Sequence, residues 1–403
     1  MSVVADDRGR GRRDSRMKIL QVHNLYRVGG GENVVLDRDR AELEAAGHEV
    51  VRHTQPNEGS VSDTVLSLAM APWNPLEARK ISMVLDEQQP DIVHVHNTWF
   101  RMSPAVIRAA SRAGYPIVQT LHNYRWLCVN GEMLRDGQLC RDCVTGNRSS
   151  AVRHGCYRDS TPLSIVAATT GAVADRRGVW KRDIDRFITL TPAAKDLFTS
   201  WGFPKDRLVV RPHRIDDPGE RASSPSQSDT VLYVGRVTDI KGVARLCAAW
   251  SRSERPYRLV IVGDGPIEAR LRSSYPDIEF RGRMGPDEVL GLMRQSRALM
   301  LPTEWEEGFP LVVVEALATG LPVALSSIAI VRDYVARIGP EWVFDVFDDD
   351  EWERVFALIA DDAAVDRAGV AARGEYVADF APDGAASLLA IYEDAIRHRS
   401  LRT

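Results

Sequence analysis

Two basic residues and two carboxylates stand beside predicted strands in the second half of the chain. Arg236 and Lys241 lie in VLYVGRVTDIKG, just past a strand, where two cations can hold a diphosphate. Only six of the 52 basic residues are Lys, so a Lys at position 241 is unexpected under the chain's own bias towards Arg. A solvated basic turn is the alternative that this spacing leaves open.

The two carboxylates are Glu307 and Glu315, in the segment PTEWEEGFPLVVVEALATGLPV. Glu307 ends a loop, Pro310 suits the first turn of a helix, and Glu315 falls about two turns further along. Because the predicted helix is otherwise apolar, we expect Glu315 to be half-buried and to need partners. The two carboxylates can then meet different parts of one ligand, whereas the alternative is an ordinary surface helix.

Three consecutive glycines follow the first predicted strand. Gly29, Gly30 and Gly31 precede Glu32 and the apolar start of a helix. Glycine lets backbone N–H groups approach a phosphate at a helix N-terminus, but a tight strand-to-helix turn explains the same residues. The spacing is neither G-x-G-x-x-G nor G-x-x-x-x-G-K-[ST], which disfavours NAD-binding and P-loop sites.

Four cysteines gather within 29 residues of the first half of the chain: Cys128, Cys140, Cys143 and Cys156. Thiolates at such spacing, with a central C-x-x-C, suit tetrahedral Zn²⁺. A reducing cytosol argues against disulfides. Two interpretations stay open: a structural zinc site, with His154 as a spare ligand, and four reduced thiols that line a loop beside a cleft.

The elements that must position these residues alternate short Val/Ile/Leu runs with helix-length amphipathic stretches. This pattern predicts an α/β fold of βαβ units, with two doubly wound parallel sheets facing each other across a cleft. The polar stretch DDPGERASSPSQS, residues 216–228, is interpreted as a linker. We expect a disordered leader at 1–16, a first domain at 17–215 with a Cys-rich insertion at 128–156, a second domain at 229–383, and a helix within 384–403 that packs back on the first domain.

Composition and charge limit the classes of function. The 403 residues are 44% hydrophobic and 27% charged, and the net charge is −4, so the whole chain is no polycation for nucleic acid. No apolar run reaches the roughly 18 residues of a membrane span. Residues 148–182 hold seven Lys or Arg against two Asp, around an apolar segment. This stretch suits an anionic lipid surface, and a solvated helix with a buried apolar face is the alternative.

These motifs together resemble glycosyltransferase family 4, whose members are retaining enzymes of the GT-B fold. The resemblance rests on GGGE near the start, TLHNY at 120–124, VGR…KG at 234–242 and EGFPLVVVEALATGLPV at 307–323. It implies a nucleotide-sugar donor, and a glycan, lipid-linked or small-molecule acceptor. It also implies a cytoplasmic location, peripheral at the inner membrane face. Since no DxD motif ends a predicted strand, we expect no cofactor in catalysis.

The resemblance also implies a role for each motif residue. Glu315 is expected to bind the ribose, Glu307 the donor sugar, and His122 the sugar near its reacting carbon. Arg236 and Lys241 are expected to clamp the diphosphate. The remaining implied donor contacts come from both halves of the chain: Gly30, Gly31, Met284 beside the base, and the helix start near Phe309 and Leu311.

One motif departs from the family pattern, and the function has alternatives. His213 and Arg214 replace the usual Asn-Gly after the last strand of the first domain, which is expected to alter the hinge or the cleft floor. The leading interpretation is a retaining glycosyltransferase that uses a UDP- or GDP-sugar in the assembly of cell-surface polysaccharide or glycolipid. The alternatives are a nucleotide-sugar epimerase of similar architecture and a non-catalytic nucleotide-sugar-binding subunit.

Overall fold

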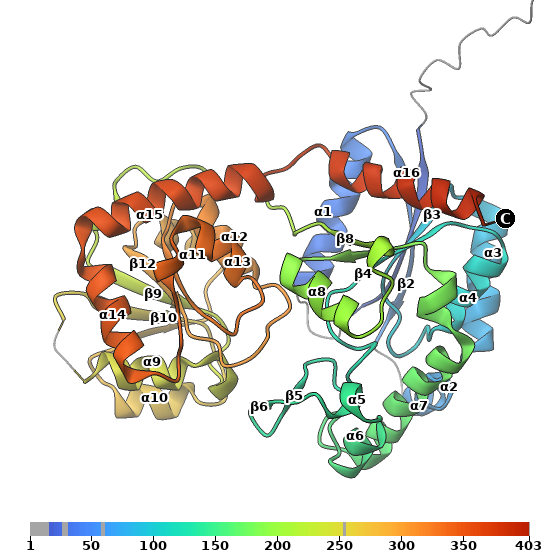
Figure 1. Ribbon diagram of the computed structural model, residues 1–403, viewed down its shortest axis with the longest axis horizontal. Coiled ribbons are helices and arrows are strands. Elements are labelled where there is room, and N and C mark those ends of the chain that lie inside the picture. The colour runs from blue at the N-terminus through green and yellow to red at the C-terminus, as the bar shows by residue number, and fades with distance from the viewer. Residues whose placement is uncertain (1–15, 26–30, 58–60, 253–254, 403) are drawn as a thin grey trace, which may run out of the picture.

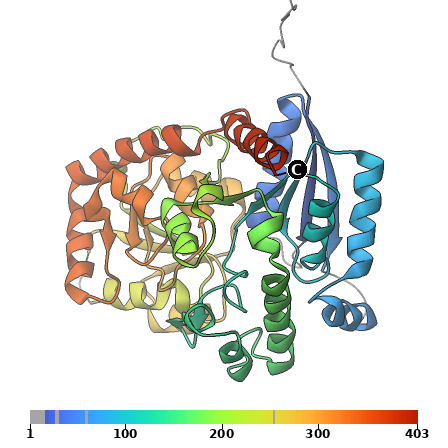
Figure 2. The same cartoon turned by 45° about the vertical axis from the view of Figure 1, so that its right-hand side comes forward.

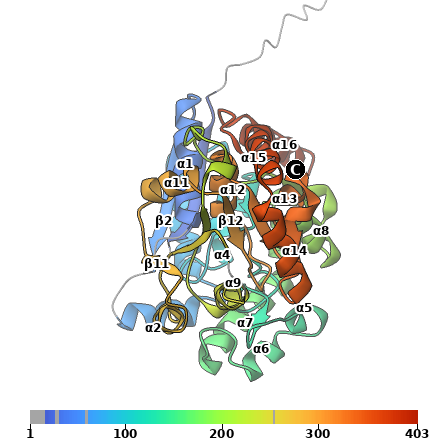
Figure 3. The same ribbon diagram turned by 90° about the vertical axis from the view of Figure 1, so that its left-hand side faces the viewer.

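The computed structural model describes residues 16–25, 31–57, 61–252 and 255–402 (Figure 1). Almost all of the expected leader and Gly30 lie outside these ranges. Figure 1 shows two α/β bodies side by side, and Figure 3 looks along the same molecule with the second body in front. No helix among the described residues is long and apolar enough to cross a membrane.

The first body is built on a six-stranded parallel sheet in the order β2-β1-β3-β4-β7-β8. The central strands are buried along their length, since helices cover both faces. The strands are β1 (Lys18–Leu25), β2 (Glu49–Pro56), β3 (Ile92–Asn97), β4 (Ile117–Thr120), β7 (Arg186–Thr189) and β8 (Leu208–Val210). The helices are α1 (Gly31–Ala45), α2 (Val61–Met70), α3 (Pro75–Gln88), α4 (Ala105–Arg112), α7 (Thr161–Arg177) and α8 (Pro192–Ser200).

The second body repeats this plan with the strand order β11-β10-β9-β12-β13-β14, again all parallel. The two-residue strand β14 at its edge had no signal in the sequence pattern. The strands are β9 (Thr230–Val234), β10 (Arg258–Val262), β11 (Glu279–Gly282), β12 (Ala298–Leu301), β13 (Val323–Ser326) and β14 (Val343–Phe344). The helices are α9 (Val243–Trp250), α10 (Glu268–Ser274), α11 (Pro286–Arg294), α12 (Leu311–Ala318), α13 (Arg332–Ile338), α14 (Asp349–Ala360) and α15 (Asp362–Glu375).

The Cys-rich segment forms a small module at the lower edge of the first body (Figures 1 and 2). It contains the antiparallel pair β5 (Leu134–Arg135) and β6 (Gln138–Leu139), followed by α5 (Asp142–Thr145) and α6 (Ser149–Arg153). These elements are too short to be recognised from sequence periodicity.

The last helix, α16 (Ala386–Ser400), leaves the second body and packs on the first sheet (Figure 1). Its Leu388, Ile391 and Tyr392 share one buried cluster with Ile19 of β1 and Ile92 of β3. The chain therefore crosses between the two bodies twice, once after β8 and once before α16.

The two crossings lie side by side. The backbone N–H of Ile215 donates to the Phe380 carbonyl at 3.0 Å, and Arg38 Nη1 donates to the Arg214 carbonyl at 2.9 Å. Beyond this point, the stretch that we interpret as a linker is fastened along the second body. Arg373 Nη1 bonds Asp217 Oδ1 at 2.8 Å, for example.

Candidate active site

A cavity of about 440 Å³ lies between the two bodies and takes its walls from both. In open α/β sheets, ligands bind outside the carboxyl ends of the strands where the strand order reverses. That point lies between β1 and β3 in the first sheet and between β9 and β12 in the second. Five of the residues singled out from the sequence line this cleft: His122, Arg236, Glu307, Phe309 and Leu311.

Lys241 is joined to the cleft through Glu307. The Lys241 ammonium forms an ion pair with Glu307 Oε1, and both side chains are largely buried. Lys241, Glu307 and Leu311 also line a smaller cavity of about 200 Å³ at the carboxyl ends of β9 and β12. The Trp305 ring centroid lies 5.7 Å from Lys241 Nζ. The second body thus places a cation, a carboxylate and the first turn of α12 around one pocket.

Gly308 explains why a glycine follows Glu307. A Cβ added at Gly308 would lie 2.7 Å from the backbone carbonyl oxygen of His122, which belongs to the other body. Any other residue would therefore push the two walls of the cleft apart. Gly242, just after Lys241, has φ +70° and would place a Cβ 1.8 Å from the Pro302 oxygen, so only glycine fits that turn.

A column of histidine rings runs from the core of the first body into the cleft. The ring centroids of His94 and His96 lie 4.1 Å apart, His96 and His122 5.3 Å, and His122 and His213 5.4 Å. The edge of the column meets Phe309 of the second body, with the His213 and Phe309 centroids 5.0 Å apart. His213, noted above as a departure from the family pattern, therefore forms part of the cleft floor.

Burial keeps these rings neutral. Removal from water lowers the pKa of His122 to about 4 and that of His94 to about 3, because the charged imidazolium loses its hydration. The pKa values of His96 and His213 fall well below 6.5 for the same reason. The ring of His122 is joined to its neighbour by a 3.1 Å contact between His122 Nε2 and His96 Nδ1.

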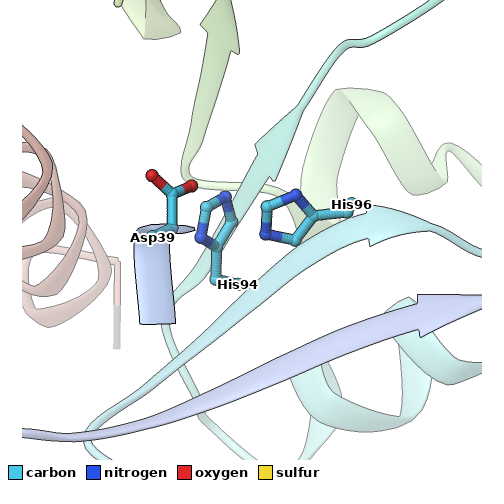
Figure 4. A group of neighbouring side chains, drawn as sticks. All are labelled: Asp39, His94 and His96. Atoms are coloured by element: carbon cyan, nitrogen blue, oxygen red, sulfur yellow. The ribbon is translucent and has the colours of Figure 1, made fainter. Parts of the chain in front are cut away.

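Figure 4 shows the inner end of the column, where Asp39, His94 and His96 bring possible ligand atoms within 4.8 Å of one another. The atoms of Asp39 and His94 already have partners within the protein. Arg211 Nη1 pairs with Asp39 Oδ1 at 3.1 Å, and His94 Nδ1 lies 2.8 Å from the Tyr392 hydroxyl. The other ring nitrogen of His94 lies 2.9 Å from a threonine hydroxyl. We therefore interpret the group as a hydrogen-bonded support for α16 and the column.

Other residues from the sequence analysis lie apart from these cavities. Glu315 is half-buried on α12, and burial raises the pKa of its carboxyl while Arg38 of the first body opposes that shift. Met284 follows β11 and packs, partly buried, against the core of the second body. Gly31 is the first residue of α1, and Gly30 lies outside the described residues.

The four cysteines of the insertion are all free thiols. Cys128 and Cys143 form a hydrogen-bonded pair, which lowers the pKa of Cys128 to about 6 and raises the pKa of Cys143. Among the residues that the structure describes, no three cysteine sulfurs lie within 4.8 Å of one another. Cys140 and Cys156 would have to rotate towards the pair to complete a tetrahedral set.

Some cleft residues were missed in the sequence analysis. Arg125 and Trp305 line the cleft, and Arg141 of the insertion contacts the second body through Glu306. Arg141 Nη2 lies 2.7 Å from both carboxylate oxygens of Glu306, next to Glu307. Arg125 follows His122 by only three positions, so its closeness in sequence was the available signal. Nothing in the sequence paired Arg141 with a residue 165 positions away.

Comparison with known proteins agrees with this geometry. Residues 30–213 match the family model described as "Glycosyl transferase 4-like domain", and residues 228–361 match "Glycosyl transferases group 1". A D-inositol 3-phosphate glycosyltransferase of Xylanimonas cellulosilytica is 26% identical over 97% of this chain and 100% of its own length. A 2-deoxystreptamine glucosyltransferase of Streptomyces kanamyceticus is 27% identical over 75% of this chain and 77% of its own.

The fold has solved counterparts. Anabaena HepE, crystallised with UDP, superposes with a TM-score of 0.64 at 15% identity, over 96% of this chain and 100% of its own. This likeness confirms the predicted arrangement of two doubly wound domains. With its two halves matched by the two family models and a glycosyltransferase aligned along nearly its whole length, the chain belongs to the group 1 glycosyltransferases of family 4, enzymes of the GT-B fold that use nucleotide sugars.

Proposed function

We propose that the chain is a retaining glycosyltransferase that moves a sugar from a UDP- or GDP-sugar to a glycan, lipid-linked or small-molecule acceptor in cell-surface polysaccharide or glycolipid assembly. The observation that carries this proposal is the cleft between the domains, which gathers His122 from one side and Arg236, Glu307 and the start of α12 from the other. The UDP bound to Anabaena HepE supports a uridine donor. The relatives do not suggest an epimerase or a non-catalytic subunit.

The donor's diphosphate would lie between Arg236, Lys241 and the first turn of α12. Lys241 forms an ion pair with Glu307, so donor binding would exchange that partner for phosphate oxygens. Glu307 would then be released towards the hydroxyls of the donor sugar. A helix N-terminus and two cations stabilise the negative charge that grows on a leaving diphosphate.

The remaining donor contacts are assigned by position. Glu315 would bind the ribose hydroxyls, and its half-buried carboxylate gains from such partners. Met284 would lie near the base. Gly31, the first residue of α1, and Gly30 before it in the sequence would approach the diphosphate from the first domain.

Transfer would occur on one face of the sugar. The bond between the anomeric carbon and the diphosphate oxygen breaks, the acceptor oxygen bonds to the same carbon, and the acceptor proton passes to the leaving phosphate. This route needs no second carboxylate of the glycosidase kind. His122, kept neutral by burial, would serve as a hydrogen-bonding partner of the donor sugar near that carbon.

The names of two relatives indicate acceptors of different charge. One relative is named for an inositol phosphate, which is anionic, and the other for 2-deoxystreptamine, which carries amines.

The first domain also has a surface suited to a membrane. Val65 and Leu66 of α2 and Ile165 of α7 are exposed apolar residues near the basic stretch at 148–182. We propose that this surface binds the cytoplasmic membrane face, and vesicles with and without anionic lipid test it.

The Cys-rich insertion would hold one structural zinc ion. The paired thiols of Cys128 and Cys143 support this proposal, and zinc would draw in Cys140 and Cys156. Gently purified protein should then contain about one zinc per chain, and a chelator should expose residues 128–156 to hydrogen exchange. Substoichiometric zinc would leave the insertion as four reduced thiols.

A donor panel tests the proposed function. Thermal-shift screening against UDP- and GDP-sugars should reveal one stabilising donor, because a ligand that binds only the folded state raises the melting temperature. Release of the nucleoside diphosphate, with the product's anomeric configuration read by NMR, then tests transfer and retention. An inverted anomeric centre would reject the retaining assignment.

A further inference from the structure

Arg125 occupies a junction in the first domain. It lies three positions after His122, in a turn closed by the Tyr124 N–H, which donates to the Gly131 carbonyl at 3.0 Å. The side chain lines the cleft between the domains, and it also lines a second cavity of about 440 Å³ walled by the Cys-rich insertion. Asn130 and Glu132 line both cavities as well, so the two cavities adjoin at Arg125.

The Arg125 guanidinium is held in place without being neutralised. Its Nη1 and Nη2 donate to the carbonyls of Val129 and Asn130 at 3.2 and 3.3 Å. It lies over the rings of Trp99 and Tyr157, 5.2 and 5.4 Å from their centroids. Its Nε is buried without a hydrogen-bond partner. Among the described residues, no carboxylate oxygen lies within 4.0 Å of this guanidinium.

Two other cations near the cleft are paired with carboxylates, unlike Arg125. Lys241 pairs with Glu307, and Arg141 pairs with Glu306. Arg236 has no such partner within the described ranges, and it is already assigned to the donor diphosphate. Arg125 is therefore a second unpaired guanidinium, on the opposite domain.

An unpaired, partly desolvated guanidinium is best stabilised by an oxyanion. Its planar fork matches carboxylate and phosphate geometry, and charge-assisted bonds gain strength when water is excluded. Gly131 leaves the room that the side chain needs, since a Cβ there would lie 3.1 Å from Arg125 Nη2. The surrounding residues thus accommodate the guanidinium of Arg125 without supplying a carboxylate to neutralise it.

We infer that Arg125 binds a carboxylate or phosphate group of the acceptor, so that the acceptor is an anionic sugar or cyclitol. This inference rests on the proposed function. The acceptor is favoured over the donor because Arg125 does not line the smaller pocket that holds Lys241, whereas it does line the cavity walled by the insertion. The rest of the acceptor would lie in that cavity.

The test compares matched acceptors that differ in one charge. The probes are glucose 6-phosphate and glucose, inositol 1-phosphate and inositol, and the methyl glycosides of glucuronic acid and glucose. Each is titrated into UDP-saturated protein, and each is assayed for transfer from the donor found above. Arg125→Gln removes the charge, and Arg125→Lys keeps a charge without the fork. Arg79→Gln is the control, since Arg79 is an exposed arginine of α3 that lines neither cavity.

Wild type should bind at least one anionic probe about 10- to 100-fold more tightly than its neutral partner, the range expected for a hydrogen bond to a charged group. Arg125→Gln should abolish this preference through KM while leaving neutral probes unchanged, and Arg125→Lys should restore part of it. The phosphate and carboxylate pairs show which oxyanion is read. No preference in wild type, or equal losses for charged and neutral probes, would overturn the inference. So would weaker UDP binding by Arg125→Gln, which would move the residue to the donor site. Failure of the proposed function is separate: it would appear as no donor turnover at all.

Discussion

Lys241 and Glu307 form an ion pair, and each of the two is assigned to a different part of the donor. The ion pair holds both side chains in a pocket at the carboxyl ends of β9 and β12, where the donor would bind. Lys241→Ala and Arg236→Ala should each lower kcat by at least about tenfold, because their charges matter most as the diphosphate leaves. Steady-state kinetics with Lys195→Ala of α8 as control checks this. Full kcat in both variants would place the clamp elsewhere.

Glu315 should act on binding rather than on turnover. Glu315→Ala should weaken binding of the nucleoside diphosphate by about 1–3 kcal/mol, since two ribose hydroxyls would lose a charged acceptor. Folding should survive, because removal of a half-buried carboxylate also removes its desolvation cost. Titration calorimetry measures the affinity, and Glu393→Ala, at an exposed position of α16, serves as control. Unchanged affinity would reject the ribose assignment.

The buried histidines predict a pH dependence of stability. In the folded chain the pKa of His122 is about 4 and that of His94 about 3, below the ordinary value of 6.5. The unfolded chain therefore binds more protons below pH 6.5, and the free energy of unfolding should fall as pH drops towards 4. Each such histidine contributes up to about 1.4 kcal/mol per pH unit. Urea unfolding at several pH values measures the slope, and a flat profile between pH 6.5 and 5 would show that the rings are not buried as described.

At the scale of elements, the sequence predicted most of the sheets because parallel strands buried on both faces leave continuous apolar runs. The Val/Ile/Leu runs of the sequence correspond to β1–β4 and β7–β13. The strands that were missed, β5, β6 and β14, are two residues long and carry no periodicity. Candidate residues at strand ends could be recognised because the apolar runs before them mark the strands. Arg125 and Arg141 were missed because loops position them, and loops have no period to read.

The insertion is joined to the donor-binding loop by Arg141 and Glu306. The pair is partly buried, and Arg141 also lies over the Trp201 ring, 5.4 Å from its centroid. Because Glu306 precedes Glu307, the pair should hold the loop that carries Glu307. Arg141→Ala and Glu306→Gln should each raise the donor KM several-fold. The double variant should cost no more than either single variant, since the two changes remove one interaction.

A double-mutant cycle measures that coupling, and Arg135→Ala is a suitable control because Arg135 pairs with Asp142 inside the insertion. Additive effects of Arg141→Ala and Glu306→Gln would mean that the two residues act independently and that the insertion does not order the loop.

The chain passes between the two domains at two adjacent places, after β8 and before α16. The polar stretch at 216–228 was interpreted as a linker, and Arg373 and Asp217 fasten it to the second domain. The crossing itself is narrower, and the bond from the Ile215 N–H to the Phe380 carbonyl joins its two chains. Rotation of one domain about this point would open or close the cleft without disturbing either sheet.

Donor binding should close the cleft. The site has walls on both domains, with His122 on one and Arg236 and Glu307 on the other, so a bridging diphosphate binds the closed form more tightly. Solution scattering should give a smaller radius of gyration with saturating donor than without it. Arg141→Ala removes an ion pair between the two domains, so this variant should have a larger donor-free radius than wild type and should still contract when donor binds. Identical scattering curves for wild type and variant, with and without donor, would mean that the domains do not move. The close contact of Gly308 with the His122 carbonyl would then persist in every state.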